Sequence, residues 1–284
     1  MSTPASGDST YALYALRYGI NHSWNAARSY MPTSGFVRPD GDHRLFCYCW
    51  VADSAQRTVL IDGGCDAVTA AARGLTFERS PLDSLQALDI SPAGVDDVVI
   101  THLHWDHAGH LAAFPNARIH IHPEEVRFTL GPAMRHRYLR RPYDATQLKD
   151  LVEVLFEGRV HFTGGQQEIA PGLDVYFVGG HTPGTQIVRV NTARGPVVVA
   201  SDARHYTHNN CGGEHTGVPF PVVIDVEDYC AAAATIDGLA PSADHIITGH
   251  DPEVATRYPA VGGDELITRL DVAPMGCPNP RPEG

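Results

Sequence analysis

Residues 101–110, THLHWDHAGH, place four histidines and an aspartate within one short stretch, and this stretch constrains the fold more than any other. It directly follows the apolar run VVI at 98–100, which is typical of a buried strand. Because side chains alternate along an extended segment, His102 and His104 point to the same side. The sequence therefore predicts a strand whose carboxyl end delivers imidazoles to one site.

Two further ligand candidates, Asp106 and His107, follow after the chain turns. Four ligands within six residues cannot all reach one tetrahedral centre without severe strain. We therefore expect two metal ions side by side, each bound by one pair of these residues. The pairs are His102 with His104 and Asp106 with His107.

Each ion needs more ligands, and three other β-rich runs end in a suitable side chain. These ligands are His181 in GGHTPG, Asp202 in ASDARHY and His250 in TGHD. A carboxylate such as Asp202 can bridge two cations about 3.5 to 4 Å apart, while each histidine completes one site. Because neutral imidazoles and two carboxylates leave the ions with residual positive charge, the cluster favours deprotonated water near neutral pH.

A histidine-rich loop can also be a solvated surface or a structural metal clip. Closed structural zinc sites use thiolate-rich coordination, whereas the six cysteines of this chain lack a CxxC pair of the zinc-ribbon kind. Cys47 and Cys49 share one face of a predicted strand, where burial is the expected role. The combination of HxHxDH with three strand-end ligands favours a catalytic site.

Length and composition predict a single domain spanning 1–284 with a large insertion. The chain has 284 residues, 43% of them hydrophobic, and can bury a substantial core. A formal net charge of -12 leaves no broad basic surface, so we expect no nucleic-acid partner. No apolar run reaches membrane-spanning length and the polar start lacks the pattern of a secretory signal, so we expect a cytoplasmic protein without a membrane partner.

Short β-rich segments separated by helical ones predict a layered α/β fold. Residues 11–19 alternate as an antiparallel strand would, and residues 43–64 indicate two strands joined by a turn at 53–56. Residues 123–157 are charged and helix-prone, and we expect this helical insertion to form a lid or pocket wall. The tail after about 272 is rich in Pro and Gly and is expected to be loosely ordered.

The motifs HLHWDH, GHTPG, SDA and GHD, with Asp62 in LIDGG upstream, resemble the five motifs of the metallo-β-lactamase superfamily from about Leu45 to His250. The resemblance implies a four-layer αββα sandwich with a dinuclear site along one edge of the two sheets. It also implies that Asp62 supports the ligand loop from behind without binding metal. The mixed imidazole and carboxylate ligands suit two Zn²⁺ ions, and iron, manganese or cobalt suit the same set.

Within the superfamily the chain is most similar to the N-acyl homoserine lactonase group, which includes 4-pyridoxolactonase. The similarity lies in YALYALRYG, in ASDARHY and in FPVVIDVEDY followed by PSADHIITGHDP. It implies a small-molecule substrate, either an N-acyl homoserine lactone or a heteroaromatic lactone. In that group a tyrosine three residues after the bridging aspartate assists at the substrate carbonyl. Here His205 stands at that position and Tyr206 follows, so both are candidates and Tyr206 is favoured.

The resemblance implies a hydrolase in which a metal-bridging hydroxide attacks the lactone carbonyl and Asp106 shuttles the proton to the leaving alkoxide. A thioesterase or phosphodiesterase of the same superfamily is the alternative. Residues 251–284 are too few for the glutathione-binding domain that follows the last histidine in glyoxalase II. A second alternative is a metal-binding protein without catalysis, which would keep the ligands and block the open coordination position.

Within the insertion, four arginines lie close together, at positions 135, 137, 140 and 141. They are typical of a solvated helical face, and in the functional interpretation one or two of them pair with an anionic or aromatic substrate. Phe128, Met134 and Tyr138 are expected in the core or at the face of a homodimer, which the sequence leaves open. His215 lies on a loop after Asp202 that is a candidate to reach the site.

Overall fold

The structure is a computed structural model that describes residues 9–212 and 216–276. Its strands are β1 (Ala12–Asn21), β2 (Leu45–Asp53), β3 (Thr58–Ile61), β4 (Thr76–Phe77), β5 (Asp97–Val99), β6 (Arg118–Ile121), β7 (Val160–Phe162), β8 (Gln166–Ala170), β9 (Leu173–Phe177), β10 (Gln186–Thr192), β11 (Gly195–Ser201), β12 (Ile246–Thr248), β13 (Ala260–Val261) and β14 (Asp264–Arg269). Its α-helices are α1 (Ala26–Ser29), α2 (Ala67–Ala72), α3 (Pro81–Ala87), α4 (Pro123–Thr129), α5 (Arg137–Arg140), α6 (Ala145–Phe156), α7 (Val226–Leu239) and α8 (Glu253–Arg257). Short 3₁₀ helices lie at Pro92–Gly94, Leu111–Ala113, Pro132–Arg135, Thr207–Asn209 and Ala243–His245.

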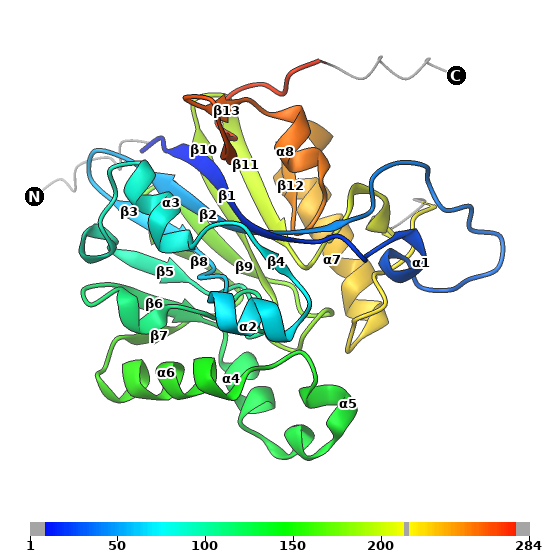
Figure 1. Cartoon of the computed structure of the whole chain (residues 1–284), viewed down its shortest axis with the longest axis horizontal. Coiled ribbons are helices and arrows are strands. Elements are labelled where there is room, and N and C mark those ends of the chain that lie inside the picture. The colour runs from blue at the N-terminus through cyan, green and yellow to red at the C-terminus, as the bar shows by residue number, and fades with distance from the viewer. Residues whose placement is uncertain (1–8, 213–215, 277–284) are drawn as a thin grey trace, which may run out of the picture.

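The strands form two sheets that pack face to face, with helices on their outer faces (Figure 1). The first sheet has the order β13-β14-β1-β2-β3-β5-β6-β7, with β4 also paired to β1, and the second has the order β12-β11-β10-β9-β8. Neighbouring strands from β3 to β7 pair in parallel, as does β11 with β12. The carboxyl ends of parallel strands meet at one edge, which is where ligand-bearing loops gather.

Three hydrophobic clusters mark the interfaces between four layers. One lies between the sheets and includes Trp50 and Val188. Another lies between the first sheet and helices α3 and α6, with Leu85 as a member, and the third joins the second sheet to α7 through Ile236. Because each sheet buries both faces, the predicted αββα sandwich is confirmed.

Strand β2 shows why the residues of this region form a central strand. Its side chains alternate between the two clusters: Tyr48 and Trp50 face the second sheet, whereas Cys47 and Cys49 face the helices. A strand with both faces covered needs apolar residues at nearly every position, and the first eight residues of β2 are all buried. The strand pairs antiparallel with β1 and β3.

Several predicted segments match the structure, and others were missed. The alternation at 11–19 corresponds to β1, and the turn at 53–56 joins β2 to β3. The insertion 123–157 is helical, with α4, α5 and α6 in it. Strand β14, which pairs with β1 in the first sheet, was not predicted. Residue 215 and the part of the tail from 277 to 284 lie outside the described residues.

In the part of the chain that the structure describes, every helix is too short or too polar to cross a lipid bilayer.

Replacement of Trp50 by Ala is expected to lower the free energy of unfolding by about 3–5 kcal/mol, because it leaves a large cavity between the sheets. Denaturant unfolding followed by circular dichroism measures the change. Phe156→Ala is the control, since Phe156 is 87% exposed and its loss should change stability by less than about 0.5 kcal/mol. Equal effects of the two substitutions would contradict the assignment of Trp50 to the core.

Candidate active site

The predicted metal ligands follow strands of both sheets and meet at one edge. The loop after β5 in the first sheet carries four of them: His102, His104, Asp106 and His107. Loops after β9, β11 and β12 in the second sheet carry the other three: His181, Asp202 and His250. Neighbouring donor atoms of these residues lie within a few ångströms of one another.

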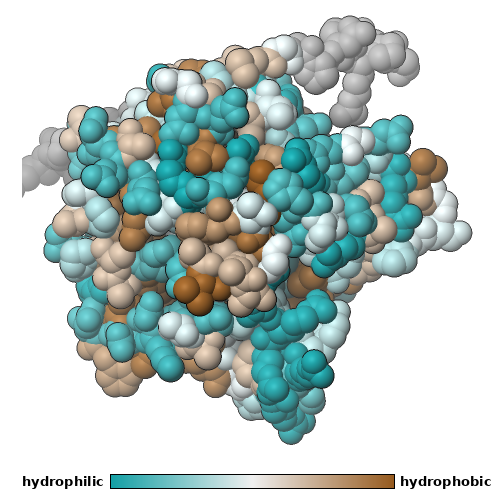
Figure 2. Space-filling view, viewed as in Figure 1, coloured by the Kyte–Doolittle hydropathy of each residue, from teal (hydrophilic) through white to brown (hydrophobic). Residues whose placement is uncertain are grey.

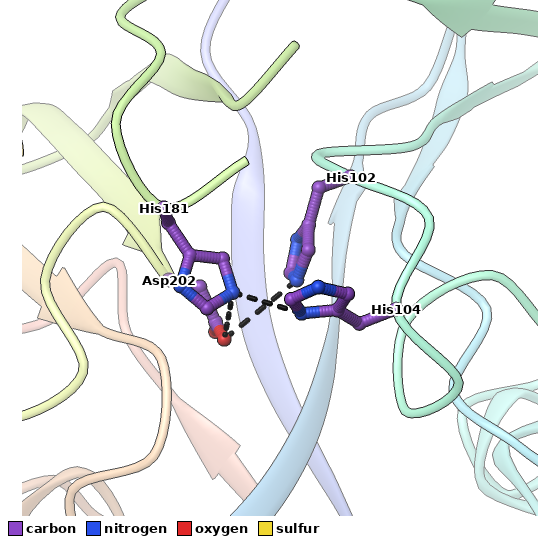
Figure 3. A group of neighbouring side chains, drawn as sticks. All are labelled: His102, His104, His181 and Asp202. Carbon is purple, nitrogen blue, oxygen red and sulfur yellow. Dashed lines mark hydrogen bonds and ion pairs between the residues drawn. The ribbon is translucent and has the colours of Figure 1, made fainter. Parts of the chain in front are cut away.

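Four of these side chains point toward one another, with His102 and His104 opposite His181 and Asp202 (Figure 3). Nε2 of His181 lies 2.9 Å from Nδ1 of His104 and 3.2 Å from Oδ2 of Asp202. Nε2 of His102 lies 3.7 Å from the same carboxylate oxygen. Ligand atoms around a tetrahedral ion with bonds of about 2.1 Å are about 3.4 Å apart, so this spacing fits one cation.

A second set surrounds the other oxygen of the Asp202 carboxylate. Oδ1 of Asp202 lies 3.0 Å from Nε2 of His250 and 3.3 Å from Nε2 of His107. Asp106 lies beside them, with one carboxylate oxygen 3.8 Å from Nε2 of His250 and the other 3.9 Å from Nε2 of His107. The two sets therefore meet at Asp202, as a carboxylate shared by two cations requires.

Cys47 also lies beside the second set of candidate ligands. Its place in the sequence does not indicate this position. Its Sγ and ligand atoms of Asp106 and His250 all lie within 4.8 Å of one another. The predicted burial of Cys47 and Cys49 is confirmed. Burial raises the pKa of the Cys47 thiol to about 12.

Buried ligand atoms that make no hydrogen bond indicate that this cluster fits a bound metal. Among the described residues, Nε2 of His102, Nε2 of His107 and Oδ1 of Asp202 are shielded from solvent and make no hydrogen bond. An unsatisfied buried polar atom costs about 1–3 kcal/mol, which a cation would offset. Burial, together with neighbouring imidazoles, holds the pKa of His102 and His104 well below 6.5, so both are in the neutral form that binds metal.

Asp62 lies behind the ligand loop and holds it through three hydrogen bonds. Its carboxylate accepts from the backbone N–H of Thr101 at 2.7 Å and from the Thr101 hydroxyl at 2.8 Å. It also lies 2.8 Å from Nδ1 of His107, so that Nδ1–H donates to Asp62 and Nε2 faces the cluster. These contacts are those of a supporting residue that lies outside both ligand sets.

Backbone carbonyls orient two of the other imidazoles. Nδ1 of His181 donates to the carbonyl oxygen of Val222 at 2.7 Å, and Nδ1 of His250 donates to that of Phe46 at 2.7 Å. Each bond turns Nε2 toward Asp202. The histidines are therefore held in position before any ligand binds.

Glycines allow the Asp62 loop and the ligand loop to touch backbone to backbone. The N–H of Gly63 donates to the carbonyl of His107 at 2.7 Å, and that of Gly109 donates to the carbonyl of Gly64 at 2.8 Å. A Cβ on Gly63 would lie 1.9 Å from the carbonyl oxygen of Gly109. Only glycine fits this contact, which explains the first glycine of LIDGG.

Replacement of Gly63 by Ala is expected to push the two loops apart, lower the free energy of unfolding by about 1–3 kcal/mol and reduce bound zinc below two ions per chain. Elemental analysis after zinc loading and gel filtration measures the stoichiometry. Gly164→Ala is the control, because a Cβ there meets no atom within 4 Å. Unchanged zinc content in the Gly63 variant would contradict this account of the loop contact.

Glu125, at the start of the insertion, joins both loops of the first ligand set and was not predicted. The buried carboxylate accepts from the N–H of Leu103 at 2.9 Å, from the Thr182 hydroxyl at 2.6 Å and from the N–H of Gly184 at 3.0 Å. Leu103 stands between His102 and His104 in the sequence, and Thr182 follows His181. Burial raises the pKa of Glu125, and these hydrogen bonds oppose that rise.

Glu125→Gln is expected to weaken zinc binding by about 10- to 100-fold, because an amide cannot accept all three hydrogen bonds and the loops lose their common anchor. Competition with a chromophoric chelator gives the affinity. Glu124→Gln is the matched control, since Glu124 is more exposed and its carboxylate pairs with Arg127 on the same helix. If both variants bind zinc as the parent does, Glu125 does not position the ligands.

The two candidate donors after Asp202 have different surroundings. His205 lies beside the cluster, with Nε2 2.9 Å from Oδ2 of Asp202 and Nδ1 3.3 Å from the Tyr229 hydroxyl. The Tyr206 hydroxyl instead donates to the backbone carbonyls of residues 43 and 44, and Tyr206 does not line the pocket at the cluster. This geometry argues against Tyr206, the candidate that the sequence favours, because its O–H is already bound elsewhere.

Charge at the cluster depends on the imidazoles around Asp202. Burial alone would raise the pKa of Asp202, but the neighbouring histidines, His205 first among them, hold it well below 3.8. Burial lowers the pKa of His205 to about 3, so its imidazole is neutral at pH 7. A neutral His205 keeps one N–H as a donor.

A pocket of about 290 Å³ opens onto both ligand sets. Its floor includes His104, Asp106, His181, Asp202, His205 and His250. Its walls include Trp24, Trp105 and Phe220 as well as Arg141 and Pro142 from the insertion. The insertion therefore supplies part of the pocket wall, and the cluster is accessible to a small molecule.

The fold and the site together define a class of protein: an αββα sandwich with two adjoining sets of candidate metal ligands at one edge of its sheets. A family model described as the metallo-beta-lactamase superfamily matches residues 43–229, more than half of the chain. The chain therefore belongs to the metallo-β-lactamase superfamily, which confirms the family predicted from the motifs.

Relatives within this family are named as lactonases. The chain is 30% identical over 197 residues to N-acyl homoserine lactonase AttM of Rhizobium radiobacter, covering 65% of this chain and 68% of the relative. It is 26% identical over 188 residues to an N-acyl homoserine lactonase of a Bacillus species, covering 61% and 68%. A crystal structure of a quorum-quenching N-acyl homoserine lactone lactonase superposes with a TM-score of 0.66 at 21% identity, covering 87% of this chain and 95% of that one, and so shares the fold.

Proposed function

We propose that this protein is a metal-dependent hydrolase that opens the ring of a small lactone. The observation that carries the proposal is the pair of ligand sets that share Asp202 at the floor of an accessible pocket. The names of the curated relatives support a cyclic ester as the substrate. A metal-binding protein without catalysis needs no substrate-sized pocket at its ligands, so the accessible pocket favours an enzyme.

The first cation would be held by His102, His104, His181 and Asp202, and the second by Asp106, His107, His250 and Asp202. We propose Zn²⁺ for both positions, because imidazole and carboxylate form a donor set that zinc prefers. Two such ions supply an activated water as nucleophile and polarise the lactone carbonyl.

The side chains of the protein orient the substrate and move the proton in this proposal. Asp106 lines the pocket, and its carboxylate would accept the proton released by the attacking water and pass it to the ring oxygen as the ester bond breaks. His205 also lines the pocket, with Nε2 2.9 Å from Oδ2 of Asp202, and its N–H would be free to stabilise the negative charge that develops on the carbonyl oxygen once that carboxylate oxygen binds the first cation. We assign this second role to His205 instead of Tyr206 because only His205 faces the cluster.

Zinc-loaded protein is expected to open at least one member of a lactone panel, with the released acid followed by pH-stat. The panel contains short and long N-acyl homoserine lactones, simple γ-lactones and 4-pyridoxolactone. His104→Ala should abolish the activity. Turnover of S-lactoylglutathione or bis(p-nitrophenyl) phosphate without turnover of any lactone would instead assign a thioesterase or a phosphodiesterase.

Asp106→Asn is expected to lower kcat by at least about 100-fold, because the amide can neither carry the proton nor contribute a negative charge to the second ligand set. Initial rates together with zinc content separate lost proton transfer from lost metal. Asp83→Asn, an exposed change on α3, is the control for the altered net charge. Full activity and full zinc content in the Asp106 variant would exclude Asp106 from the mechanism.

A further inference from the structure

Three arginines from separate parts of the chain line the pocket above the cluster. Arg28 lies in α1, Arg73 caps α2, and Arg141 follows α5 in the insertion. Within residues 9–212 and 216–276, none of the three forms an ion pair with a carboxylate. A guanidinium is charged at any working pH, so the pocket carries positive charge that the described residues leave uncompensated.

One wall of the pocket is a series of stacked planar groups that ends at the cluster. The guanidinium of Arg28 lies 4.0 Å from the ring centre of Trp24. Trp24 stacks on Phe220 at 5.8 Å with an angle of 10° between the rings, and Phe220 stacks on His205 at 3.6 Å with an angle of 8°. A flat ligand can lie along such a wall with favourable aromatic contacts.

Another part of the pocket lining holds its arginine in a fixed position. The guanidinium of Arg73 lies 5.5 Å from the ring centre of Trp105 and donates to the backbone carbonyls of residues 141 and 143. These bonds tie α2 to the segment that carries Arg141. This segment begins at α5. The space-filling view shows this region as a hydrophilic projection at the lower right of the molecule (Figure 2).

We propose that the pocket selects a planar lactone with an anionic substituent, the lactone ring lying at the cluster and the anion between Arg28 and Arg141. The proposal rests on the proposed function for the identity of the reacting ring. A neutral acyl chain would gain nothing from the three guanidinium groups, whereas a carboxylate can accept charge-assisted hydrogen bonds from them. The small pocket volume, about 290 Å³, suits a compact fused ring.

Paired ligands that differ only in charge test the selection without requiring turnover. Isoindolinone-5-carboxylate and isoindolinone-5-carboxamide are lactams that resist ring opening, and calorimetry on zinc-loaded protein gives both dissociation constants. The carboxylate is expected to bind at least 10-fold more tightly at low ionic strength, with the preference shrinking as salt is added. Equal affinities would overturn the proposal.

Single substitutions locate the charge that makes the difference. Arg28→Gln and Arg141→Gln are each expected to reduce the preference for the carboxylate about three- to five-fold and to leave the affinity for the carboxamide unchanged. Arg137→Gln is the matched control, because it removes the same charge from α5 outside the pocket lining. An equal loss of carboxylate preference in the Arg137 variant would show that the preference arises from the overall electrostatic potential of the protein. This result would overturn the assignment to the pocket.

The corresponding lactones, phthalide-5-carboxylate and phthalide-5-carboxamide, separate this inference from the proposed function. Faster opening of the carboxylate, expressed as a lower KM with little change in kcat, supports both. A second outcome is that the lactams show the expected preference while zinc-loaded protein opens neither phthalide nor any lactone of the panel. In that case the proposed function fails and the charge selection stands. If lactones are opened without regard to charge, the lactonase assignment stands and the selection fails.

Discussion

The carboxylate of Asp202 is the interaction on which the rest of the site depends. Its two oxygens face different ligand sets, Oδ2 toward His181 and Oδ1 toward His250. Such a position requires a rigid strand end, which β11 provides because it is paired on both sides, with β12 and β10, in the second sheet. Asp62 holds the loop after β5, and Glu125 joins that loop to the loop that carries His181, so the cluster is assembled by hydrogen bonds from residues outside it.

The residues of this cluster could be predicted because the rules that bring them together are local. Alternation along a strand places His102 and His104 on one side, and strands that end at one edge bring distant loops together. The layered fold followed from the same segments, since β-rich runs with buried patterns alternate with amphipathic helices. Strand β14 was missed because its pairing with β1 joins the two ends of the described chain, and nothing in the intervening sequence signals that contact.

Residues whose roles depend on packing could not be predicted from spacing. Glu125 resembles any acidic residue in the first turn of a helix, and only the approach of two loops gives it three donors. The sequence favours Tyr206 because a tyrosine is expected close after Asp202. It does not reveal that the chain turns the Tyr206 hydroxyl toward the backbone carbonyl of residue 43. Of the four arginines between 135 and 141, only Arg141 lines the pocket, where it joins Arg28 and Arg73 from distant segments.

The division of the ligands between the two sheets has a thermodynamic consequence. Cations at the cluster would crosslink the sandwich, because the loop after β5 belongs to one sheet and Asp202 to the other. Binding that requires the folded arrangement stabilises it by mass action, by about 2.7 kcal/mol for each ion present at 100 times its dissociation constant. The fraction of folded chains is thereby coupled to the concentration of free metal. The ligand residues would then both form the active site and hold the two sheets together.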